Sequence, residues 1–291
     1  MFNGKKVAFI ATGGGGKAIT HAGVLQACHE MNIGIDFIIG ASAGAIAGIF
    51  YSQHKNLDML VDNFRPADKR KYKFKQFGWK RMFSIKNFFS PGIINGLFDL
   101  SSAEEFFRKT LPINEFSQLD LPVYIAATNL EENDGELFGP GIRDDVPISK
   151  VLVASCCIPG LFRPVKIGNG YYVDGEIKRP LSIQAAIDLG AEIIIVSDTY
   201  ALYVKDAGTS GVFNIMSLII NMLFEDKSIR AVNTIKAKYP ERDVILIAPT
   251  IGDISSFDTG SYDKLVSRGY KAAMKEFKKY MGDDNGTEFV E

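Results

Sequence analysis

The chain has 291 residues, of which 46% are hydrophobic and 23% are charged, and a formal net charge of −1. This length and composition indicate an ordinary globular protein that can bury one large core. The near-zero net charge supplies no overall attraction to nucleic acid, so no nucleic-acid partner is expected. Three cysteines, Cys28, Cys156 and Cys157, are too few for a disulfide framework and are typical of a reducing compartment.

The first predicted element is a buried strand over Val7–Ala11, which follows Lys5 and Lys6. This apolar run is too short for the core of a signal peptide, and four glycines follow it where a cleavage site would lie. The longest other apolar stretch, Val212–Phe224, is interrupted by three polar residues and is too short to span a bilayer. The sequence therefore predicts a soluble, cytoplasmic protein.

Further along the chain, short apolar runs alternate with helical patterns. Continuous runs rich in valine and isoleucine indicate strands that are covered on both faces. The spacing of apolar residues predicts helices over about Lys17–Met31 and Tyr262–Met281. This alternation predicts a single α/β domain over residues 1–291, a three-layer sandwich with a mainly parallel central sheet, and a frayed acidic tail over residues 282–291. The predicted strands are Val7–Ala11, Phe37–Ile39, Val123–Ala127, Ile193–Val196 and Val244–Ala248.

The first strand runs into a glycine-rich loop, Gly13–Ala18, for which three interpretations compete. A phosphate-binding loop of the Walker type would need glycine at Ala11 and serine or threonine at Ala18, so it fails twice. A dinucleotide fingerprint is formally matched, but its acidic residue closes the second strand, whereas Asp36 opens it. The third interpretation is an oxyanion hole, in which N–H groups without neighbouring side chains face a carbonyl oxygen as it becomes tetrahedral. A tight turn without a ligand would not need four consecutive glycines.

A serine stands between two glycines in the segment Gly40–Gly44, whose sequence is Gly-Ala-Ser-Ala-Gly. An apolar run precedes this segment and a helical pattern follows it, which is the layout of a nucleophile elbow. The N-terminus of the helix favours developing negative charge beside the serine. Ser42 is therefore the candidate nucleophile, and the weight of this short pattern depends on the motifs around it.

The base that would activate Ser42 is not expected to be a histidine, which leaves aspartate or lysine as candidates. α/β-Hydrolases place their histidine after the serine and the acid in the chain, but the last of the three histidines here is His54. His21, one turn into the first predicted helix, is interpreted as structural. Two aspartates, Asp174 and Asp198, stand where a strand ends in a turn, and the residues alone do not choose between them.

The segment between Arg65 and Phe89 differs from the rest of the chain in composition. It contains nine basic residues, one acid and seven aromatic residues. This composition indicates an insertion over the sheet, a cap or lid at about residues 65–95. Lysines that attract anionic headgroups, together with aromatic residues at the interface, also predict contact of residues 65–89 with an anionic membrane surface. A solvated basic face whose aromatic residues complete the core of a cap is the competing interpretation.

Taken together, these segments resemble the patatin-like phospholipase family. The family pattern combines a Gly-Gly-Gly-x-Arg/Lys-Gly loop, a Gly-x-Ser-x-Gly elbow and an Asp-Gly-Gly/Ala turn. The corresponding segments of this chain are Gly13–Ala18, Gly40–Gly44 and Asp174–Glu176, and three motifs in the correct order are far more specific than one. The resemblance covers about residues 5 to 200, two thirds of the chain. Similar flanking stretches are His21–Leu25, Ala126–Leu130, Ile158–Val165 and Arg179–Leu181.

The resemblance implies a fold and a pair of catalytic residues. The fold is the patatin-like three-layer α/β sandwich, and the pair is a Ser–Asp dyad without histidine. Ser42 would be the nucleophile, and Asp174 rather than Asp198 would be the general base. Glu176 departs from the family pattern, which has glycine or alanine at this position. Its carboxylate beside the base would raise the pKa of Asp174 or obstruct the substrate.

The resemblance also implies roles for the glycine-rich loop. The amides of Gly14 and Gly15 would stabilise the oxyanion, within an oxyanion hole formed by Gly13, Gly14, Gly15 and Gly16. Lys17 occupies the basic position of the loop and is a candidate contact for an anion such as a phosphate. Ala18 replaces the last glycine of the family loop, a difference of one methyl group.

The sequence therefore predicts a serine acyl hydrolase of lipid metabolism that acts on a phospholipid or another acyl ester. Its type would be phospholipase A, lysophospholipase or carboxylic ester hydrolase, and neither a metal ion nor a cofactor is expected. Two alternatives stay open. One is a catalytically weak or silent lipid- or acyl-binding regulator on the same scaffold, and the other is an acyl thioesterase or acyltransferase. The sequence does not determine the acyl chain, the headgroup or the oligomeric state.

Overall fold

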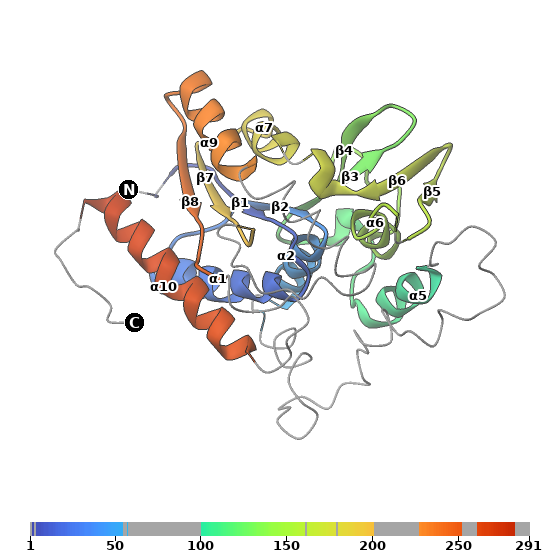
Figure 1. Ribbon diagram of the computed structural model, residues 1–291, viewed down its shortest axis with the longest axis horizontal. Coiled ribbons are helices and arrows are strands. Elements are labelled where there is room, and N and C mark those ends of the chain that lie inside the picture. The colour runs from blue at the N-terminus through green and yellow to red at the C-terminus, as the bar shows by residue number, and fades with distance from the viewer. Residues whose placement is uncertain are drawn as a thin grey trace.

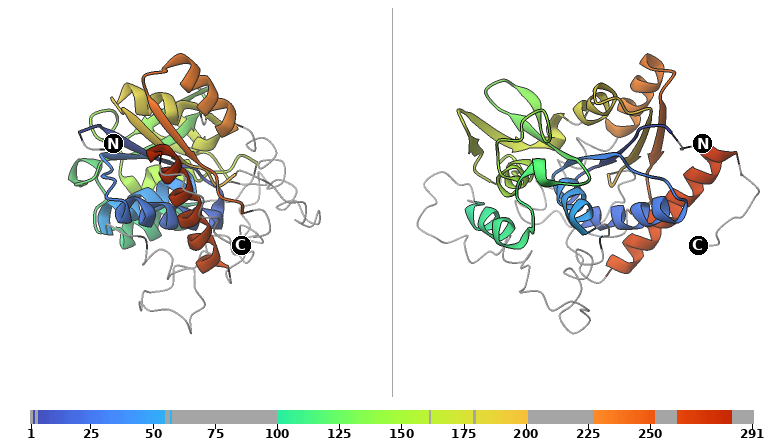
Figure 2. Two further views of the ribbon diagram at one scale, coloured as in Figure 1. Left: turned by 90° about the vertical axis from the view of Figure 1, so that its left-hand side faces the viewer. Right: turned by 180° about the vertical axis from the view of Figure 1, so that it is seen from behind.

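A computed structural model describes residues 2, 4–54, 57, 100–160, 162–178, 180–200, 227–251 and 261–282. In these residues a single β-sheet carries helices on both faces (Figures 1 and 2). The basic and aromatic segment 65–89, with the cap predicted at about residues 65–95, lies outside the described residues, and so do the apolar stretch 212–224 and the tail from residue 283. The predicted membrane contact therefore stays a prediction.

Parallel strands form the centre of the sheet, in the order β3-β2-β1-β7-β8. Nearly all of their residues are buried, because helices pack on both sides of them. The prediction of a three-layer sandwich with a mainly parallel sheet is confirmed. The bounds are β1 Val7–Ala11, β2 Phe37–Ala41, β3 Val123–Asn129, β7 Ile193–Ser197 and β8 Asp243–Ile247.

The other side of the sheet is antiparallel. β4 (Asp134–Phe138) and β6 (Gly170–Asp174) both pair with β3, and β5 (Val165–Ile167) pairs with β6. β4 and β5 were not predicted, because they are short and partly exposed and give no continuous apolar run.

Helices cover both faces of the sheet and enclose two hydrophobic clusters. The predicted helix over 17–31 is a short 3-10 helix, η1 (Gly15–Ile19), followed by an α-helix, and the helix over 262–281 has the predicted bounds. No helix in the described ranges is both long enough and apolar enough to cross a bilayer. One face carries α1 (Thr20–Glu30), α2 (Ala43–His54), α5 (Ser101–Thr110), α6 (Ile148–Ser155) and α10 (Tyr262–Met281). The opposite face carries α7 (Pro180–Asp188) and α9 (Lys227–Lys238), and two further 3-10 helices are η5 (Phe116–Gln118) and η6 (Gly175–Lys178).

The long C-terminal helix α10 lies directly against α1 (Figure 1). Two glycines allow this close approach. A Cβ atom at Gly23 of α1 would overlap the carbonyl oxygen of Val266, and one at Gly269 of α10 would overlap the carbonyl oxygen of Thr20. The N-terminal and C-terminal parts of the chain therefore share one packed layer.

Candidate active site

Ser42 lies in the sharp turn between β2 and α2. Its φ angle is +52°, in the left-handed region that residues with a side chain rarely adopt. A Cβ atom at Gly40 would lie 2.5 Å from the Cα of Ala45, and one at Gly44 would overlap the carbonyl oxygen of Ala11. The turn therefore accepts only glycine at both positions, which is the reason for the Gly-x-Ser-x-Gly pattern.

A hydroxyl group from α6 holds the backbone of this turn. The Ser42 amide donates a hydrogen bond of 2.8 Å to Ser155 Oγ, and the Ser155 hydroxyl donates one of 2.7 Å to the carbonyl oxygen of Ala126 on β3. Ser155 is fully buried, so neither bond competes with solvent. Sequence analysis did not identify Ser155, and nothing in its local sequence distinguishes it from an ordinary helix residue.

Asp174 is the last residue of β6, and its position relative to Ser42 follows from the strand register. β4 pairs with residues 125–129 of β3, β2 with 123–126 and β6 with 127–129. The β3 residues that pair with β4 include some that pair with β2 and some that pair with β6. A residue has one strand on each side, so β4 occupies one edge of β3, and β2 and β6 share the opposite edge. Ala41 pairs with Ala126 and Asp174 with Ala127, so the carboxyl ends of β2 and β6 meet at adjacent positions of β3.

At this junction the Ser42 hydroxyl lies close enough to the Asp174 carboxyl group to lower its pKa. Asp174 is buried, with 7% of its surface exposed, and burial raises its pKa from 3.8 to about 7. The negative charge of Glu176 also raises this pKa, whereas the hydrogen bond from the Glu176 amide and the nearby Ser42 hydroxyl lower it. The structure thus brings together the two residues predicted as a dyad, a hydroxyl and a carboxylate that titrates near neutral pH.

Asp198, the other candidate base, lies at the end of β7 and supports the glycine-rich loop. Its Oδ1 atom accepts hydrogen bonds from the Thr12 hydroxyl at 3.4 Å and from the Tyr200 amide at 3.0 Å. His21 also supports the loop, since Nε2 lies 2.8 Å from the carbonyl oxygen of Thr12 and Nδ1 lies 2.7 Å from Ser197 Oγ. These contacts agree with the structural role expected for His21.

The glycine-rich loop lies against the nucleophile. A Cβ atom at Gly13 would lie 2.9 Å from the Cβ of Ser42, and Gly14 and Gly15 have φ angles of +109° and +59°. The carbonyl oxygen of Gly13 accepts a hydrogen bond from the Thr199 hydroxyl. These contacts fix the loop beside the hydroxyl group that would attack a substrate.

One of the four predicted oxyanion donors is engaged within the protein. The Gly13 amide donates a hydrogen bond of 2.6 Å to Oε1 of Glu176, which is 1% exposed. Among the hydrogen bonds within the described residues, none has the Gly14 or the Gly15 amide as its donor. Gly16 lies inside η1. The amides of Gly14 and Gly15 are therefore the two loop donors best able to bind a substrate oxygen.

The position of Asp36 does not fit a dinucleotide site. Asp36 precedes β2, and its Oδ2 atom accepts a hydrogen bond of 2.6 Å from the amide of Val7. Because β1 and β2 are parallel, this contact lies at the opposite end of the strands from the loop that follows β1. A ribose held by Asp36 could not belong to a dinucleotide bound at the glycine-rich loop.

A model of the family described as Patatin-like phospholipase matches residues 11–187, more than half of the chain. The chain belongs to the patatin-like phospholipase family. The matched region contains Ser42, Asp174 and the glycine-rich loop. The resemblance inferred from three short motifs is thereby confirmed.

Relatives in this family include fungal lysophospholipases. Lysophospholipase nte1 of Neurospora crassa is 23% identical over 297 residues, which cover 95% of this chain and 18% of that protein. Lysophospholipase nte1 of Emericella nidulans is 27% identical over 198 residues, or 67% of this chain and 12% of that protein. The chain thus spans less than one fifth of the length of these curated relatives.

A solved structure shares the patatin-like fold. VipD from Legionella pneumophila superposes with a TM-score of 0.51 at 13% sequence identity, over 94% of this chain and 67% of that chain. Such low identity supports similarity of the fold alone.

In this patatin-like domain, Lys17 lies on η1 directly after the four glycines. Its side chain is partly buried, and burial lowers the pKa of its ammonium group. A partly desolvated ammonium group gains more from an anionic partner than a fully hydrated one does. The predicted contact of Lys17 with an anion therefore stays a prediction.

Two thiols lie next to the predicted Ser42–Asp174 dyad, and the sequence analysis assigned them no role. Ser42 lies close enough to the Cys156 thiol to affect its pKa, and the carbonyl oxygen of Cys157 accepts a hydrogen bond of 2.9 Å from the Asp174 amide. Burial and the charge of Asp174 hold the pKa of Cys156 well above its ordinary value, and they raise that of Cys157 to about 12. Both thiols are therefore neutral near pH 7 and are poor nucleophiles.

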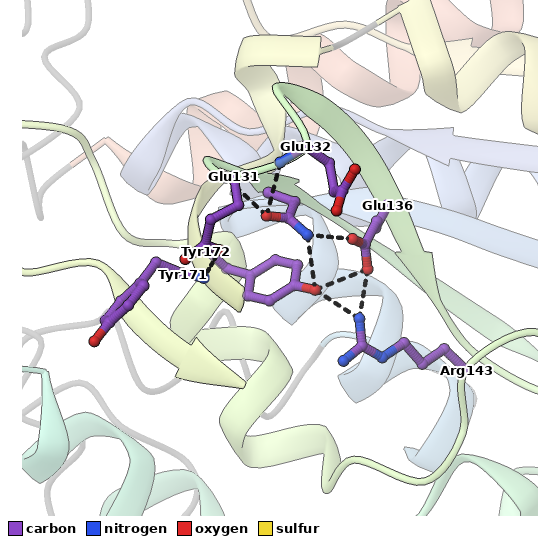
Figure 3. Close-up of polar contacts among 7 residues, drawn as sticks. Glu131, Glu132, Glu136, Arg143, Tyr171 and Tyr172 are labelled. Carbon is purple, nitrogen blue, oxygen red and sulfur yellow. Dashed lines mark hydrogen bonds and ion pairs between the residues drawn. The ribbon is translucent and has the colours of Figure 1, made fainter. Parts of the chain in front are cut away.

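A polar network lies on the same face of the sheet as Asp174 (Figure 3). Glu136 and Asp174 both pair with Ala127, from opposite edges of β3. The carboxylate of Glu136 forms an ion pair with Arg143 and accepts hydrogen bonds from Asn129 and Tyr172. The network fixes β4 and β6 on β3 and neutralises the charge of Glu136 close to the base. Among the described residues, no group of three or more His, Cys, Asp and Glu side chains could hold a metal ion.

Proposed function

We propose that the chain is a serine acyl hydrolase that cleaves the ester bond of a phospholipid, a lysophospholipid or a related acyl lipid. Ser42 is the nucleophile and Asp174 is the general base. The observation that carries the proposal is the strand register, which places Ser42, in its strained turn, beside the buried carboxyl group of Asp174. Membership of the patatin-like phospholipase family and the lysophospholipases among the relatives support an acyl lipid as the substrate class.

The acylation step uses the dyad and the loop together. Ser42 Oγ forms a bond with the carbonyl carbon of the ester while the Asp174 carboxylate accepts the hydroxyl proton. The carbonyl electron pair moves onto oxygen, and the amides of Gly14 and Gly15 donate hydrogen bonds to the oxyanion. One such donor is typically worth about 3 kcal/mol in the transition state. The C–O bond to the alcohol then breaks, the alcohol takes the proton from Asp174, and the acyl group remains on Ser42.

Hydrolysis of the acyl-enzyme repeats these roles with water. Asp174 accepts a proton from a water molecule, whose oxygen bonds to the acyl carbon to form a second tetrahedral oxyanion. When this intermediate breaks down, Ser42 Oγ leaves and recovers its proton from Asp174, and the fatty acid is released. A carboxyl group with a pKa of about 7 can accept and return a proton near neutral pH.

Lys17 is the proposed contact for the phosphate of a phospholipid headgroup. It follows the loop that would hold the carbonyl oxygen, so a headgroup a few bonds away from the ester could approach its ammonium group. A charge-assisted hydrogen bond of this type contributes about 1.5–3 kcal/mol. A neutral p-nitrophenyl acyl ester lacks this contact, whereas a lysophospholipid makes it.

The decisive experiment tests whether Ser42 is activated. A fluorophosphonate probe, which reacts with activated serines, is expected to label the wild-type protein and not the Ser42→Ala variant. Hydrolysis of lysophosphatidylcholine and of a p-nitrophenyl acyl ester is expected to fall by about 10³-fold or more in Ser42→Ala and in Asp174→Asn. Circular dichroism spectra would verify that both variants are folded.

Two surface substitutions serve as matched controls. Ser101→Ala and Asp120→Asn change the same residue types at exposed positions and are expected to retain wild-type activity. Unchanged turnover in Ser42→Ala or Asp174→Asn would disprove the dyad. A wild-type protein that neither reacts with the probe nor hydrolyses an ester would favour the silent regulator. Faster turnover of acyl thioesters than of esters would favour a thioesterase.

A further inference from the structure

Glu176 contacts both the base and the glycine-rich loop, and the mechanism above does not use it. Its amide donates a hydrogen bond of 2.9 Å to Asp174 Oδ1, and its Oε1 atom accepts the bond of 2.6 Å from the Gly13 amide. The side chain is 1% exposed, so the bond to Gly13 is shielded from water. The short helix η6, which starts directly after Asp174, places Glu176 between these two parts of the site.

We propose that Glu176 is a positioning residue for acyl transfer, whose carboxylate fixes the glycine-rich loop through the Gly13 amide so that the next two amides face Ser42. The inference rests on the proposed function, because it assigns a role to Glu176 in the same reaction. The family pattern described above has glycine or alanine at this position.

The need for such an anchor follows from the loop itself. Consecutive glycines have large conformational freedom, and their amides point toward an oxyanion only when something else fixes the backbone. Both polar backbone groups of Gly13 are held here, its carbonyl group by Thr199 and its amide by Glu176. Gly13 is therefore fixed, and it limits the orientations that the following amides of Gly14 and Gly15 can adopt. Donors fixed before the reaction need no reorganisation when the oxyanion forms.

The close packing leaves little freedom for this arrangement to shift. A Cβ atom at Gly13 would lie 2.9 Å from Ser42 Cβ, 3.1 Å from Glu176 Cγ and 2.9 Å from the hydroxyl oxygen of Tyr200. Glu176 therefore packs against the Cα atom of the residue that it binds. Loss of its carboxylate would remove a hydrogen bond and leave a space next to the loop.

A second consequence concerns the charge at the base. The negative charge of Glu176 raises the pKa of Asp174, in addition to the larger effect of burial. Other titratable groups face this region: Cys156 and Cys157 after α6, Glu136 across β3, and Lys17 and Tyr200 beside the loop. The two thiols are neutral near pH 7 and Glu136 is paired with Arg143. A change of charge at Glu176 should therefore be visible in the pH profile.

Two substitutions separate the contact from the charge. Glu176→Ala removes both, whereas Glu176→Gln keeps an oxygen that can accept from the Gly13 amide and removes only the charge. The assay uses a saturating concentration of a p-nitrophenyl acyl ester at a pH at which Asp174 is ionised. Under these conditions we expect kcat of Glu176→Ala to fall by about 10- to 100-fold, with little change in KM. Glu176→Gln should retain kcat within about threefold. Glu132→Ala, at an exposed position, is the matched control and should match the wild type.

The pH profile distinguishes a positioning role from simple structural support. In the wild type, kcat/KM is expected to fall below about pH 7, as Asp174 becomes protonated. Without the charge of Glu176 the pKa of Asp174 is lower, so this acidic limb should move to lower pH in Glu176→Gln, by about one pH unit. Thermal unfolding of each variant would show that the compared proteins are folded.

Three results would overturn the proposal. Wild-type or higher kcat in Glu176→Ala would mean that the carboxylate obstructs the loop or has no effect on it. A loss of kcat in Glu176→Gln as large as in Glu176→Ala would exclude the anchoring bond, and an acidic limb that does not move in Glu176→Gln would exclude the effect of charge. Fluorophosphonate labelling separates this failure from failure of the proposed function. Equal rates of labelling in the wild type and Glu176→Ala would disprove only the positioning role of Glu176. An unlabelled wild type would disprove the proposed function.

Discussion

Asp174 shows how burial adapts a common side chain to an uncommon task. An ordinary carboxyl group titrates near 3.8 and is a weak base at neutral pH, whereas burial at the end of β6 raises this pKa to about 7. A base of that strength is suited to acyl transfer near neutral pH. The same burial makes ionisation costly for the folded protein, so the proposed catalytic role of this residue opposes stability.

Replacement of Asp174 by asparagine is expected to stabilise the protein above about pH 7, although on the proposed mechanism it would abolish hydrolysis. Between 3.8 and about 7 the folded state binds more protons at this carboxyl group than the unfolded state, so stability decreases as pH rises through this interval. Asparagine does not ionise and avoids the loss, with a net gain of about 1–3 kcal/mol at high pH once altered hydrogen bonds are included. Denaturant unfolding at about pH 4 and about pH 8 measures this gain.

The control for this comparison is Asp120→Asn, which changes an exposed aspartate. Its stability relative to the wild type should differ little between the two pH values. An Asp174→Asn variant whose advantage fails to grow from low to high pH would show that the carboxyl group is not strained by ionisation.

Among the elements, the contact between α1 and α10 depends on the absence of two side chains. Gly23 and Gly269 bring the backbone of each helix against a carbonyl oxygen of the other. Leu265, Ala273 and Phe277 of α10 are fully buried as a result. A methyl group at either glycine cannot be accommodated by a side-chain rotation, because the atom that it meets belongs to the backbone.

Gly23→Ala is expected to lower the free energy of unfolding by about 1–3 kcal/mol or more, because the helices must separate to admit the new Cβ atom. Gly34→Ala is the matched control, since a Cβ atom at Gly34 meets no other atom within 4 Å. The midpoint of denaturant unfolding measures both effects. Equal midpoints for the two variants would mean that the helices do not pack as described.

The strands that the sequence patterns predicted are those whose residues are nearly all buried. A parallel strand such as β7 is covered on both faces, so each of its residues is apolar and the run is easy to recognise. β4 lies on the partly exposed side of the sheet and includes Asp134, Gly135 and Glu136, so its sequence resembles a loop. Its pairing with β3 is set by tertiary contacts that no local pattern contains.

In the candidate site, too, some features are visible in the local sequence and others depend on contacts between distant elements. The strained turn at Ser42 and the glycine-rich loop are local features, and their glycines are visible in the sequence. The choice between Asp174 and Asp198 was not local, because it depends on which strand end meets β2. The supporting hydroxyl groups of Ser155 and Thr199 also come from distant elements and could not be predicted.

For the whole molecule, the described segments beyond the family match are part of the core. The family match ends at residue 187, yet β7 pairs with β1 at the centre of the sheet and Ser197 and Thr199 contact His21 and the glycine-rich loop. The segments beyond the matched region therefore help to build the candidate site.

A chain that ends at residue 261, and so lacks α10, is not expected to fold. It loses the burial of several apolar side chains, each worth about 1.5–3 kcal/mol, and exposes the matching face of α1. This loss is comparable with the total stability of a typical domain, about 5–15 kcal/mol. A chain that ends at Gly282 keeps α10 and its terminal cap and is the control. Cooperative thermal unfolding of the shorter chain would contradict this expectation.

β2 and β6 meet along one edge of β3, but they are synthesised at different times. The proposed activity therefore depends on how much of the chain has been made. Residues 37–41 can pair with β3 as soon as that strand has emerged from the ribosome, but the partner of Ser42 is added almost fifty residues later. Every nascent chain that stops before β6 carries a hydroxyl with no acceptor for its proton. On the proposed mechanism, the chain would therefore gain its activity only when most of its sheet is complete.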